Sequence, residues 1–155
     1  MKIIQSAFLN FEQKETVFKL WNSEYPEGIC YSEILEFEYY LRTLSNICHY
    51  LLINDKNQIL GWAFTFIRED QKWFAIILNS KIHSQGYGTL LLDELKRKNS
   101  FLNGWVIDHS KEVKQNKETY NSPITFYIKN GFIINRDIRI ENDKISAVKI
   151  MWKRQ

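Results

Sequence analysis

A polar, glycine-containing segment is the first place where residue types and spacing could do chemistry. It reads Leu78-Asn79-Ser80-Lys81-Ile82-His83-Ser84-Gln85-Gly86-Tyr87-Gly88-Thr89 and joins an apolar stretch to an amphipathic one. Where a strand passes into the first turn of a helix, unpaired backbone N–H groups and the helix dipole form a site for phosphate oxygens. Gly86 and Gly88 lack a Cβ atom, so a bulky phosphate could approach closely. The segment is neither a P-loop nor a G-x-G-x-x-G fingerprint.

A second segment, Asn121-Ser122-Pro123-Ile124-Thr125-Phe126-Tyr127-Ile128-Lys129-Asn130-Gly131-Phe132, follows one predicted strand later. Ser122-Pro123 is typical of a helix start and Asn130-Gly131 of a left-handed helix end. Tyr127 lies between them, and a phenol can donate a proton to a leaving group. Taken separately, the glycines could simply make a tight turn, and Tyr127 could simply pack in the core.

Together the two segments resemble the GNAT superfamily of acyl-CoA-dependent N-acetyltransferases. The family loop reads R/Q-x-x-G-x-G/A, and His83-Ser84-Gln85-Gly86-Tyr87-Gly88 matches it at the glycines. The family helix often reads F/L-Y-x-x-x-G-F, which Phe126-Tyr127-Ile128-Lys129-Asn130-Gly131-Phe132 matches. His83 departs from the pattern, because a neutral imidazole brings no permanent charge where the family usually has Arg or Gln. The order of elements also matches, so the resemblance spans nearly the whole chain.

The resemblance implies acetyl-CoA as co-substrate, without a metal. The loop amides would hold its pyrophosphate, with support from Lys81, the backbone at Leu78 would bind the pantetheine arm, and Tyr127 would lie beside the thioester sulfur. The implied cofactor-binding residues are Leu78, His83, Ser84, Gln85, Gly86, Tyr87, Gly88, Thr89, Asn121 and Tyr127.

The implied reaction is N-acetylation of a primary amine by direct attack in a ternary complex. A leaving thiolate needs a proton, which the phenol of Tyr127 can supply, and a developing oxyanion needs a backbone N–H near Leu78. Neither Cys30 nor Cys48 lies in the two motifs, which argues against a cysteine nucleophile.

The acceptor side is less specified. Asp108, at the C-terminal end of the strand that follows the cofactor helix, is the first candidate for a general base. The other candidates are carboxylates that could bind a cationic acceptor and aromatic residues that could line its pocket: Glu24, Glu27, Glu33, Tyr25, Tyr31 and Trp62. Solvation at the surface is the simpler explanation for the carboxylates, and core packing explains the tryptophan as well. The acceptor could be a small-molecule or a peptide amine, and the protein a monomer or a homodimer.

A non-catalytic acyl-CoA-binding sensor or regulatory module is the alternative, motivated by His83 and by the missing obvious base. A nucleic-acid binder is disfavoured, because the net charge of +3 is scattered along the chain. The densest basic run, Lys96-Arg97-Lys98, lies at a predicted helix C-terminus, where cations complement the dipole. His49 and His109 have no metal-ligand spacing.

Composition sets the frame for these segments. The 155 residues, 45% of them hydrophobic and 15% aromatic, predict a single domain over residues 1–155 with a sizeable core. No apolar run approaches the roughly 20 residues of a membrane helix. Two cysteines outside any C-x-x-C motif predict free thiols, and with no signal-peptide pattern at the N-terminus we expect a cytoplasmic protein.

Periodicity then predicts the elements that position the motifs. Apolar alternation or short apolar runs predict seven strands: 2–8, 49–53, 60–66, 73–78, 102–108, 132–140 and 145–152. Helical spacing and caps predict four helices, of which the first follows Asn10, the second is capped by Ser32 and runs to Leu44, and the others cover 89–98 and 123–130. The polar composition of residues 109–121 predicts a mobile loop.

The order β-α-α-β-β-β-α-β-α-β-β indicates an α/β fold. We expect a mixed, mostly antiparallel sheet of about seven strands with helices on both faces. The strand–loop–helix–strand unit around residues 73–108 must join two parallel strands.

Overall fold

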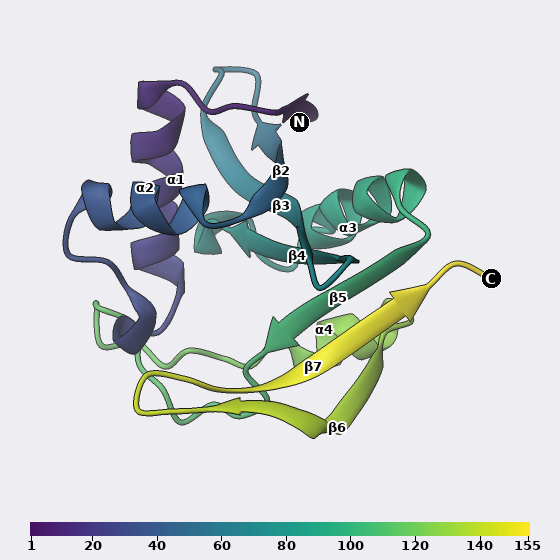
Figure 1. Ribbon diagram of the computed structural model, residues 1–155. Helices are drawn as coiled ribbons and strands as arrows, with labels where there is room; N and C mark the ends of the chain where they lie inside the picture. The colour runs from purple at the N-terminus through teal and green to yellow at the C-terminus, as the bar shows by residue number, and fades with distance from the viewer.

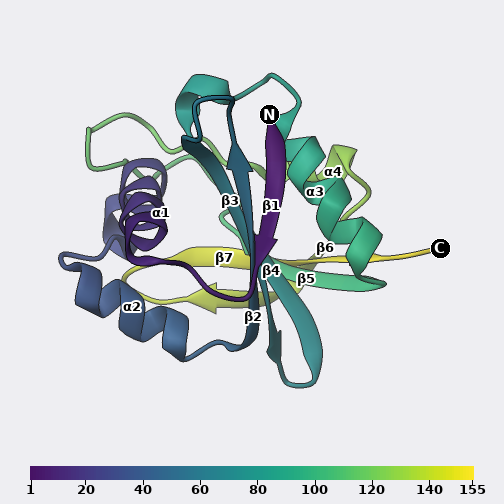
Figure 2. The same cartoon turned by 90° about the horizontal axis from the view of Figure 1, so that it is seen from above.

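The computed structural model describes residues 1–155 as one seven-stranded sheet with helices on both faces (Figures 1 and 2). The strands are β1 (Lys2–Ser6), β2 (Ser45–Ile53), β3 (Ile59–Arg68), β4 (Gln71–Leu78), β5 (Phe101–Val106), β6 (Ile133–Glu141) and β7 (Ser146–Lys153). The helices are α1 (Phe11–Glu24), α2 (Ile34–Arg42), α3 (Tyr87–Lys98) and α4 (Ile124–Lys129), with short 3₁₀ helices η1 (Glu27–Ile29) and η2 (Ser80–Ile82). The order of strands and α-helices confirms the prediction. None of the helices combines the length and apolarity needed to cross a membrane.

The sheet consists of two antiparallel blocks that meet at one short seam. The strand order is β1-β2-β3-β4-β5-β7-β6, so the apolar strand β4 lies at the centre. β2, β3 and β4 form an antiparallel meander, β1 pairs with β2 at its edge, and β7 lies between β5 and β6. β4 and β5 are parallel, as predicted, but their register is limited to one pair, Trp73 with Asn103.

Each face of the sheet carries its own hydrophobic core. Figure 2 shows α1 and α2 on one face and α3 and α4 on the other. The alternation of β3 sends Trp62, Phe64 and Phe66 into the core beneath α1 and α2, and Ala63 into the core beneath α3 and α4. Only the second core lies beneath α3, the helix that the sequence predicted to follow the cofactor loop.

Local capping explains where several helices begin and end. Asn10 Oδ1 accepts from the Gln13 N–H while the Gln13 side chain accepts from the Asn10 N–H, so a capping box starts α1 directly after Asn10, where the sequence predicted the helix to begin. Gly131, with φ of +84°, ends α4, and the Phe132 N–H donates to the Tyr127 carbonyl. These contacts fix the segment that presents Tyr127.

Several predicted boundaries differ from the structure, and β5 ends at Val106, so Asp108 follows the strand instead of ending it. The cap of α2 is Glu33, and the Ser32 hydroxyl donates instead to the Glu36 carboxylate. Pro123 precedes α4 rather than starting it, and the Ser122 hydroxyl donates to the Ile107 carbonyl, which ties α4 to the end of β5. β2 begins at residue 45 rather than 49, because an irregular register at its start hides the period of two.

The 109–121 segment is held in place rather than free. Val113 pairs with Thr119 in a small antiparallel turn, and Pro26 pairs with Lys114. The Glu27 N–H also donates to the Val113 carbonyl at 2.9 Å. The segment therefore lies against the connection between α1 and α2, below the C-terminal end of α1 in Figure 1.

The basic side chains at the C-terminal end of α3 are engaged in contacts with neighbouring groups. The Lys96 ammonium donates to the Asn130 carbonyl and lies over the rings of Phe132 and Trp152. Arg97 forms an ion pair with Glu94 at 2.7 Å, and Lys98 lies 3.8 Å from the same carboxylate. These contacts explain the run by the packing of α3.

Candidate functional site

The N-terminus of α3 forms a row of open backbone donors. Gly86 is its N-cap, with φ of +87°, and no side chain caps the helix. No N–H from residue 84 to residue 89 donates a hydrogen bond within the chain, and the first intrahelical bond runs from Leu90 N–H to the Gly86 carbonyl. With twelve residues of helix behind them, these amides and the dipole are arranged to bind an anion.

The two glycines of the loop have different reasons to be glycine. A Cβ at Gly86 would meet no atom within 4 Å, so the positive φ and the open space around it favour glycine there. A Cβ at Gly88 would lie 3.2 Å from the Phe126 ring, so this glycine allows α3 to approach α4. Gly88 therefore has a packing reason to be glycine, and the expectation that both glycines admit a phosphate stays a prediction.

The C-terminal end of β4 has an open edge beside the loop. Asn79 N–H donates to the Leu60 carbonyl, and Leu78 pairs with Gly61. In an antiparallel ladder this register turns the N–H and C=O of Leu78 away from β3, toward the side of β5. Because the pairing of β4 with β5 is confined to Trp73, an extended ligand could use the backbone of Leu78 as a strand would.

His83 is turned toward that edge. Its Nε2 atom lies 2.9 Å from the Leu78 carbonyl oxygen. Since a carbonyl only accepts, Nε2 carries the proton in this contact. The side chain of Gln85 donates to the Lys81 carbonyl at 3.1 Å and braces the same turn. His83 therefore contacts the strand end, whereas the sequence placed it among the phosphate-binding residues.

Tyr127 combines a buried ring with an unpaired hydroxyl group. The ring is 7% exposed and packs edge-to-face against Phe74, Phe126 and Phe132. The hydroxyl makes no hydrogen bond within the chain, and it is not sealed, because Asn103 Oδ1 is the one sealed side-chain polar atom without a partner. Burial, with a smaller effect of Tyr120, raises the pKa of Tyr127 above its usual value. At neutral pH the group is a protonated donor without a hydrogen-bond partner in the chain.

Two more tyrosines accompany Tyr127. The rings of Tyr25, which follows α1, and Tyr120, from the 109–121 segment, lie 6.4 Å apart. Burial raises the pKa of Tyr25, and the phenols of Tyr120 and Tyr127 raise it further. The sequence proposed Tyr25 as a pocket residue but missed Tyr120, since a tyrosine in a polar segment carries no local signal.

The carboxylates expected on the acceptor side are mostly engaged. Glu24 accepts from the Ser80 N–H at 2.9 Å and pairs with Lys114 at 3.3 Å, so it joins α1, η2 and the 109–121 segment. Glu27 pairs with Lys117 at 3.0 Å, and Glu33 is exposed at the start of α2. Glu24 therefore acts as a clamp between segments rather than as a free anion.

Asp108 is also engaged. Arg139 donates to both of its carboxylate oxygens, at 2.8 and 3.0 Å, and further to Glu141 and Ser146. The hydrogen bond from Arg139 lowers the pKa of Asp108, which makes it a weaker proton acceptor. This arrangement argues against the general-base role expected from the sequence. Asn121, in contrast, is exposed and forms no hydrogen bond within the chain, so it is free to contact a ligand.

The two remaining aromatic candidates, Trp62 and Tyr31, lie in different surroundings. Trp62 is fully buried, stacks on Phe64 and donates to His49 Nδ1, so it belongs to the core rather than to an acceptor pocket. Tyr31 stacks on Tyr40 beside α2. Core packing, the simpler explanation for Trp62, is therefore the correct one.

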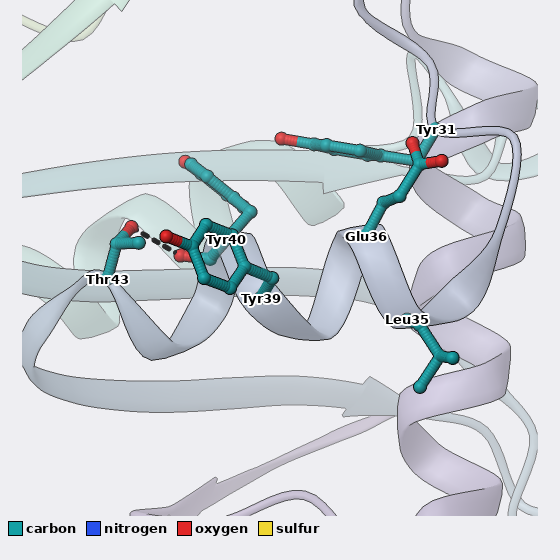
Figure 3. Close-up of a pocket in the computed structure, with 6 residues that line it drawn as sticks. All are labelled: Tyr31, Leu35, Glu36, Tyr39, Tyr40 and Thr43. Carbon is teal, nitrogen blue, oxygen red and sulfur yellow. Dashed lines mark hydrogen bonds between the residues drawn. The ribbon is translucent and has the colours of Figure 1, made fainter.

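Two surface hollows lie outside the open edge of β4. Figure 3 shows the first, of about 530 Å³, which is lined by Tyr31, Leu35, Glu36, Tyr39, Tyr40 and Thr43. The second, of about 840 Å³, lies between the start of α1 and the outer side of η2. Neither includes a residue of the 84–89 row or Tyr127. We therefore place the candidate site at the open strand edge and not at these hollows.

Comparison with known proteins establishes the fold. No protein-family model matches the chain, and no curated protein matches it in sequence. A GNAT-superfamily phosphinothricin acetyltransferase from Sinorhizobium meliloti, in complex with AcCoA, superposes with a TM-score of 0.69 at 9% identity, covering 99% of this chain and 89% of that one. A ribosomal-protein-alanine N-acetyltransferase from Brucella melitensis has a TM-score of 0.69 at 13% identity, covering 99% of both chains.

A chimeric spermidine N-acetyltransferase from Vibrio cholerae and hSSAT has a TM-score of 0.67 at 14% identity, covering 99% of this chain and 96% of that one. At such identities the likeness concerns the fold alone. The chain has the GNAT acetyltransferase fold, which confirms the fold expected from the two motifs.

Proposed function

We propose that the chain is an N-acetyltransferase that moves an acetyl group from acetyl-CoA to a primary amine. The observation that carries the proposal is the open edge of β4 at Leu78, which leads into the unpaired amides of residues 84–89. One structural neighbour is in complex with AcCoA and the others are acetyltransferases, which supports the same ligand and chemistry for this chain.

In this proposal the amides before α3 hold the pyrophosphate, and the backbone of Leu78 binds the pantetheine arm. Gly86 gives the phosphates room, and Asn121 contacts the cofactor from the segment before α4. The Leu78 N–H is placed to stabilise the oxyanion that develops on the thioester carbonyl. The amides of residues 84–89 are unpaired in the structure, whereas the Leu78 carbonyl is contacted by His83 and would have to be released for the pantetheine arm.

Tyr127 supplies the acid. As the amine nitrogen bonds to the carbonyl carbon and the C–S bond breaks, the phenol donates its proton to the departing thiolate, and the amine nitrogen loses a proton to solvent. The raised pKa of Tyr127 keeps the phenol protonated before this step. Asp108 takes no part in this scheme, because Arg139 already engages both of its oxygens.

A non-catalytic acyl-CoA-binding module is the second candidate. One observation favours it: the ring of His83 occupies the Leu78 carbonyl, an acceptor that the pantetheine arm would use. A protein that binds the cofactor without an acceptor amine would need no base, and none is present as a free carboxylate beside Tyr127.

Calorimetry with acetyl-CoA, free CoA and ATP tests both candidates. We expect micromolar binding of acetyl-CoA to the wild type and a loss of at least about 100-fold in Gly86→Glu, because the new carboxylate repels the phosphates. Gly86→Gln is the matched control, since it has the same size and backbone strain without the charge. Equal losses in both variants would contradict phosphate binding at this loop.

Release of CoA then separates the two candidates. Release that depends on an added amine establishes the transferase. Binding of acetyl-CoA with no release in the presence of any primary amine would favour the module.

A further inference from the structure

The hollow of Figure 3, here called the α2 hollow, lies on the outer side of α2 and has a volume of about 530 Å³. Positions 35, 36, 39, 40 and 43 line it, and helical spacing places all five on one side of α2. Phe37 and Leu41, on the opposite side, are buried in the core. Tyr31 reaches the hollow from the turn before the helix. The α2 hollow is therefore built by one helix and the turn that leads into it.

Three tyrosine rings give the α2 hollow an aromatic lining. The rings of Tyr31 and Tyr40 stack on each other, with centroids 5.8 Å apart at an interplanar angle of 29°, so they form one wall and leave no slot between them. Trp21 supports this wall, at 5.6 Å from the Tyr31 ring and 5.4 Å from the Tyr40 ring. Tyr39 is 71% exposed, so its ring is open to a ligand. The space of the hollow lies beside these rings.

Glu36 is the one charged residue in the lining. Its Oε1 atom accepts from the Ser32 hydroxyl at 3.0 Å, and Oε2 has no partner within the chain. Figure 3 shows this carboxylate on the side of the helix where Tyr31 and Tyr40 lie. Burial, with a smaller effect of Glu36, raises the pKa of Tyr31 to about 12, so that phenol stays neutral. The α2 hollow therefore combines aromatic surface with one negative charge.

The cations near this side of α2 are engaged elsewhere. Burial raises the pKa of Tyr40 and the charge of Arg68 partly offsets this, but the Arg68 guanidinium lies over the ring of Trp73, 5.3 Å from its centroid. Arg42, the last residue of α2, lies 3.6 Å from another carboxylate of the same helix. Neither arginine lines the hollow. Glu36 is therefore left without a positively charged partner from the chain.

We infer that the α2 hollow binds a small molecule that carries a trimethylammonium group, with the methyl groups on the tyrosine rings and the positive charge beside Glu36. A cation is attracted to the face of an aromatic ring, and most strongly when it carries little hydration. A primary ammonium group would bring three N–H donors to a single free carboxylate oxygen, whereas a trimethylammonium group has no N–H to satisfy. Because one helix and one turn supply the whole lining, the site suits a compact head group better than an extended chain.

Three small molecules with a common hydroxyethyl chain test the inference. Choline and 3,3-dimethylbutan-1-ol have the same shape with and without the charge, while choline and ethanolamine carry the same charge with and without the methyl groups. Each is titrated into the full chain and followed by the NMR shifts of the α2 amides. We expect choline to bind in the millimolar range, at least about fivefold more tightly than either analogue. No saturable binding of choline, or equal binding of either analogue, overturns the inference.

Variants assign the binding to this hollow. Glu36→Gln and Tyr39→Leu should each weaken choline binding by about two- to fivefold, and Tyr39→Phe should retain it because the ring remains. Glu36 and Tyr39 are both exposed, so these variants are expected to fold. Glu33→Gln is the matched control, since it removes the same charge from an exposed position at the start of α2 outside the lining. Unchanged affinity in Glu36→Gln and Tyr39→Leu, or an equal loss in Glu33→Gln, overturns the assignment.

A trimethyllysine peptide distinguishes the free molecule from a protein side chain. Binding of this peptide more than about tenfold tighter than that of choline would overturn the small-molecule ligand. Binding no tighter than that of choline supports it. These titrations need neither acetyl-CoA nor turnover, and no residue of the 84–89 row lines the hollow. The inference and the proposed acetyl transfer therefore stand or fall separately.

Discussion

The cofactor side and the acceptor side of this molecule are built in different ways. The cofactor side uses the backbone of one continuous stretch, residues 78–89, with an open strand edge followed by unpaired amides. The acceptor side uses side chains that arrive from α1, the 109–121 segment and α4, and that are held together by Glu24 and Lys114. A backbone site tolerates many side chains, whereas a side-chain site depends on each one, so under the proposed function we expect specificity to depend on the acceptor side.

Removing the hydroxyl of Tyr127 should give the largest effect, and it breaks the acceptor side without touching the cofactor side. We expect Tyr127→Phe to lower turnover by about 100-fold, the usual contribution of a general acid, because the thiolate then leaves without a proton. Affinity for acetyl-CoA should change less than about twofold, since the ring packing with Phe74 and Phe132 is retained.

The measurement is steady-state CoA release together with calorimetry of acetyl-CoA. Tyr39→Phe serves as the control, because it removes an exposed phenol away from the site. Unchanged turnover in Tyr127→Phe would refute the acid role.

Acidification should give the next largest effect, a loss of stability, and it should affect one face of the sheet more than the other. His49 is 4% exposed and accepts from the Trp62 indole, and burial, assisted by Lys14, lowers its pKa to about 4. Between that value and the usual 6.5, the unfolded chain binds a proton that the folded chain does not. Stability is therefore complete above about pH 6.5 and falls by about 2 kcal/mol by pH 5.

Urea unfolding at pH 7 and pH 5, followed by tryptophan fluorescence, measures this loss. In His49→Gln, which keeps an acceptor for the Trp62 N–H, most of the difference between the two pH values should disappear. A wild type that is equally stable at both pH values would contradict a neutral buried His49. The face beneath α3 and α4 contains no buried histidine, so acid should weaken the α1–α2 face first.

Replacing Asp108 should give the smallest effect on turnover. We expect Asp108→Asn to change turnover by less than about twofold and to lower the free energy of unfolding by about 1 kcal/mol, because the carboxylate holds Arg139 rather than a substrate. Amine-dependent CoA release and urea unfolding check the two halves of this prediction.

Arg139→Gln breaks the same pair from the other side and is the matched control. A large loss of turnover in Asp108→Asn that Arg139→Gln does not share would restore Asp108 as the base.

The two sides also differ in how far the sequence could predict them. Gly86, the Ser122-Pro123 pair and Gly131 are local signals, because each reflects the conformation of its own residue or turn. They predicted the cofactor loop and the helix that presents Tyr127. The parallel β4–β5 pair also followed, since a strand–helix–strand unit of this length allows no other direction.

The acceptor side could not be predicted in this way. Glu24 and Lys114 are 90 residues apart, and nothing in either local pattern reports the other. The placement of Tyr120 likewise depends on the pairing of Pro26 with Lys114, and the orientation of His83 depends on the Leu78 carbonyl. Contacts between residues that are far apart in the sequence produce no periodic pattern from which they could be predicted.

Because β4 and β5 share a single residue pair, the chain could be divided between them into two fragments. A cut between α3 and β5 would sever neither antiparallel block, since residues 2–78 and 101–153 each contain complete neighbouring strands. The two fragments would recognise each other through apolar packing, such as that of the α3 leucines with Leu102 and Ile150, together with a few polar contacts such as Glu24 with Lys114, and hardly through hydrogen bonds between β4 and β5. Reassembly would thus be a hydrophobic association, which weakens on cooling.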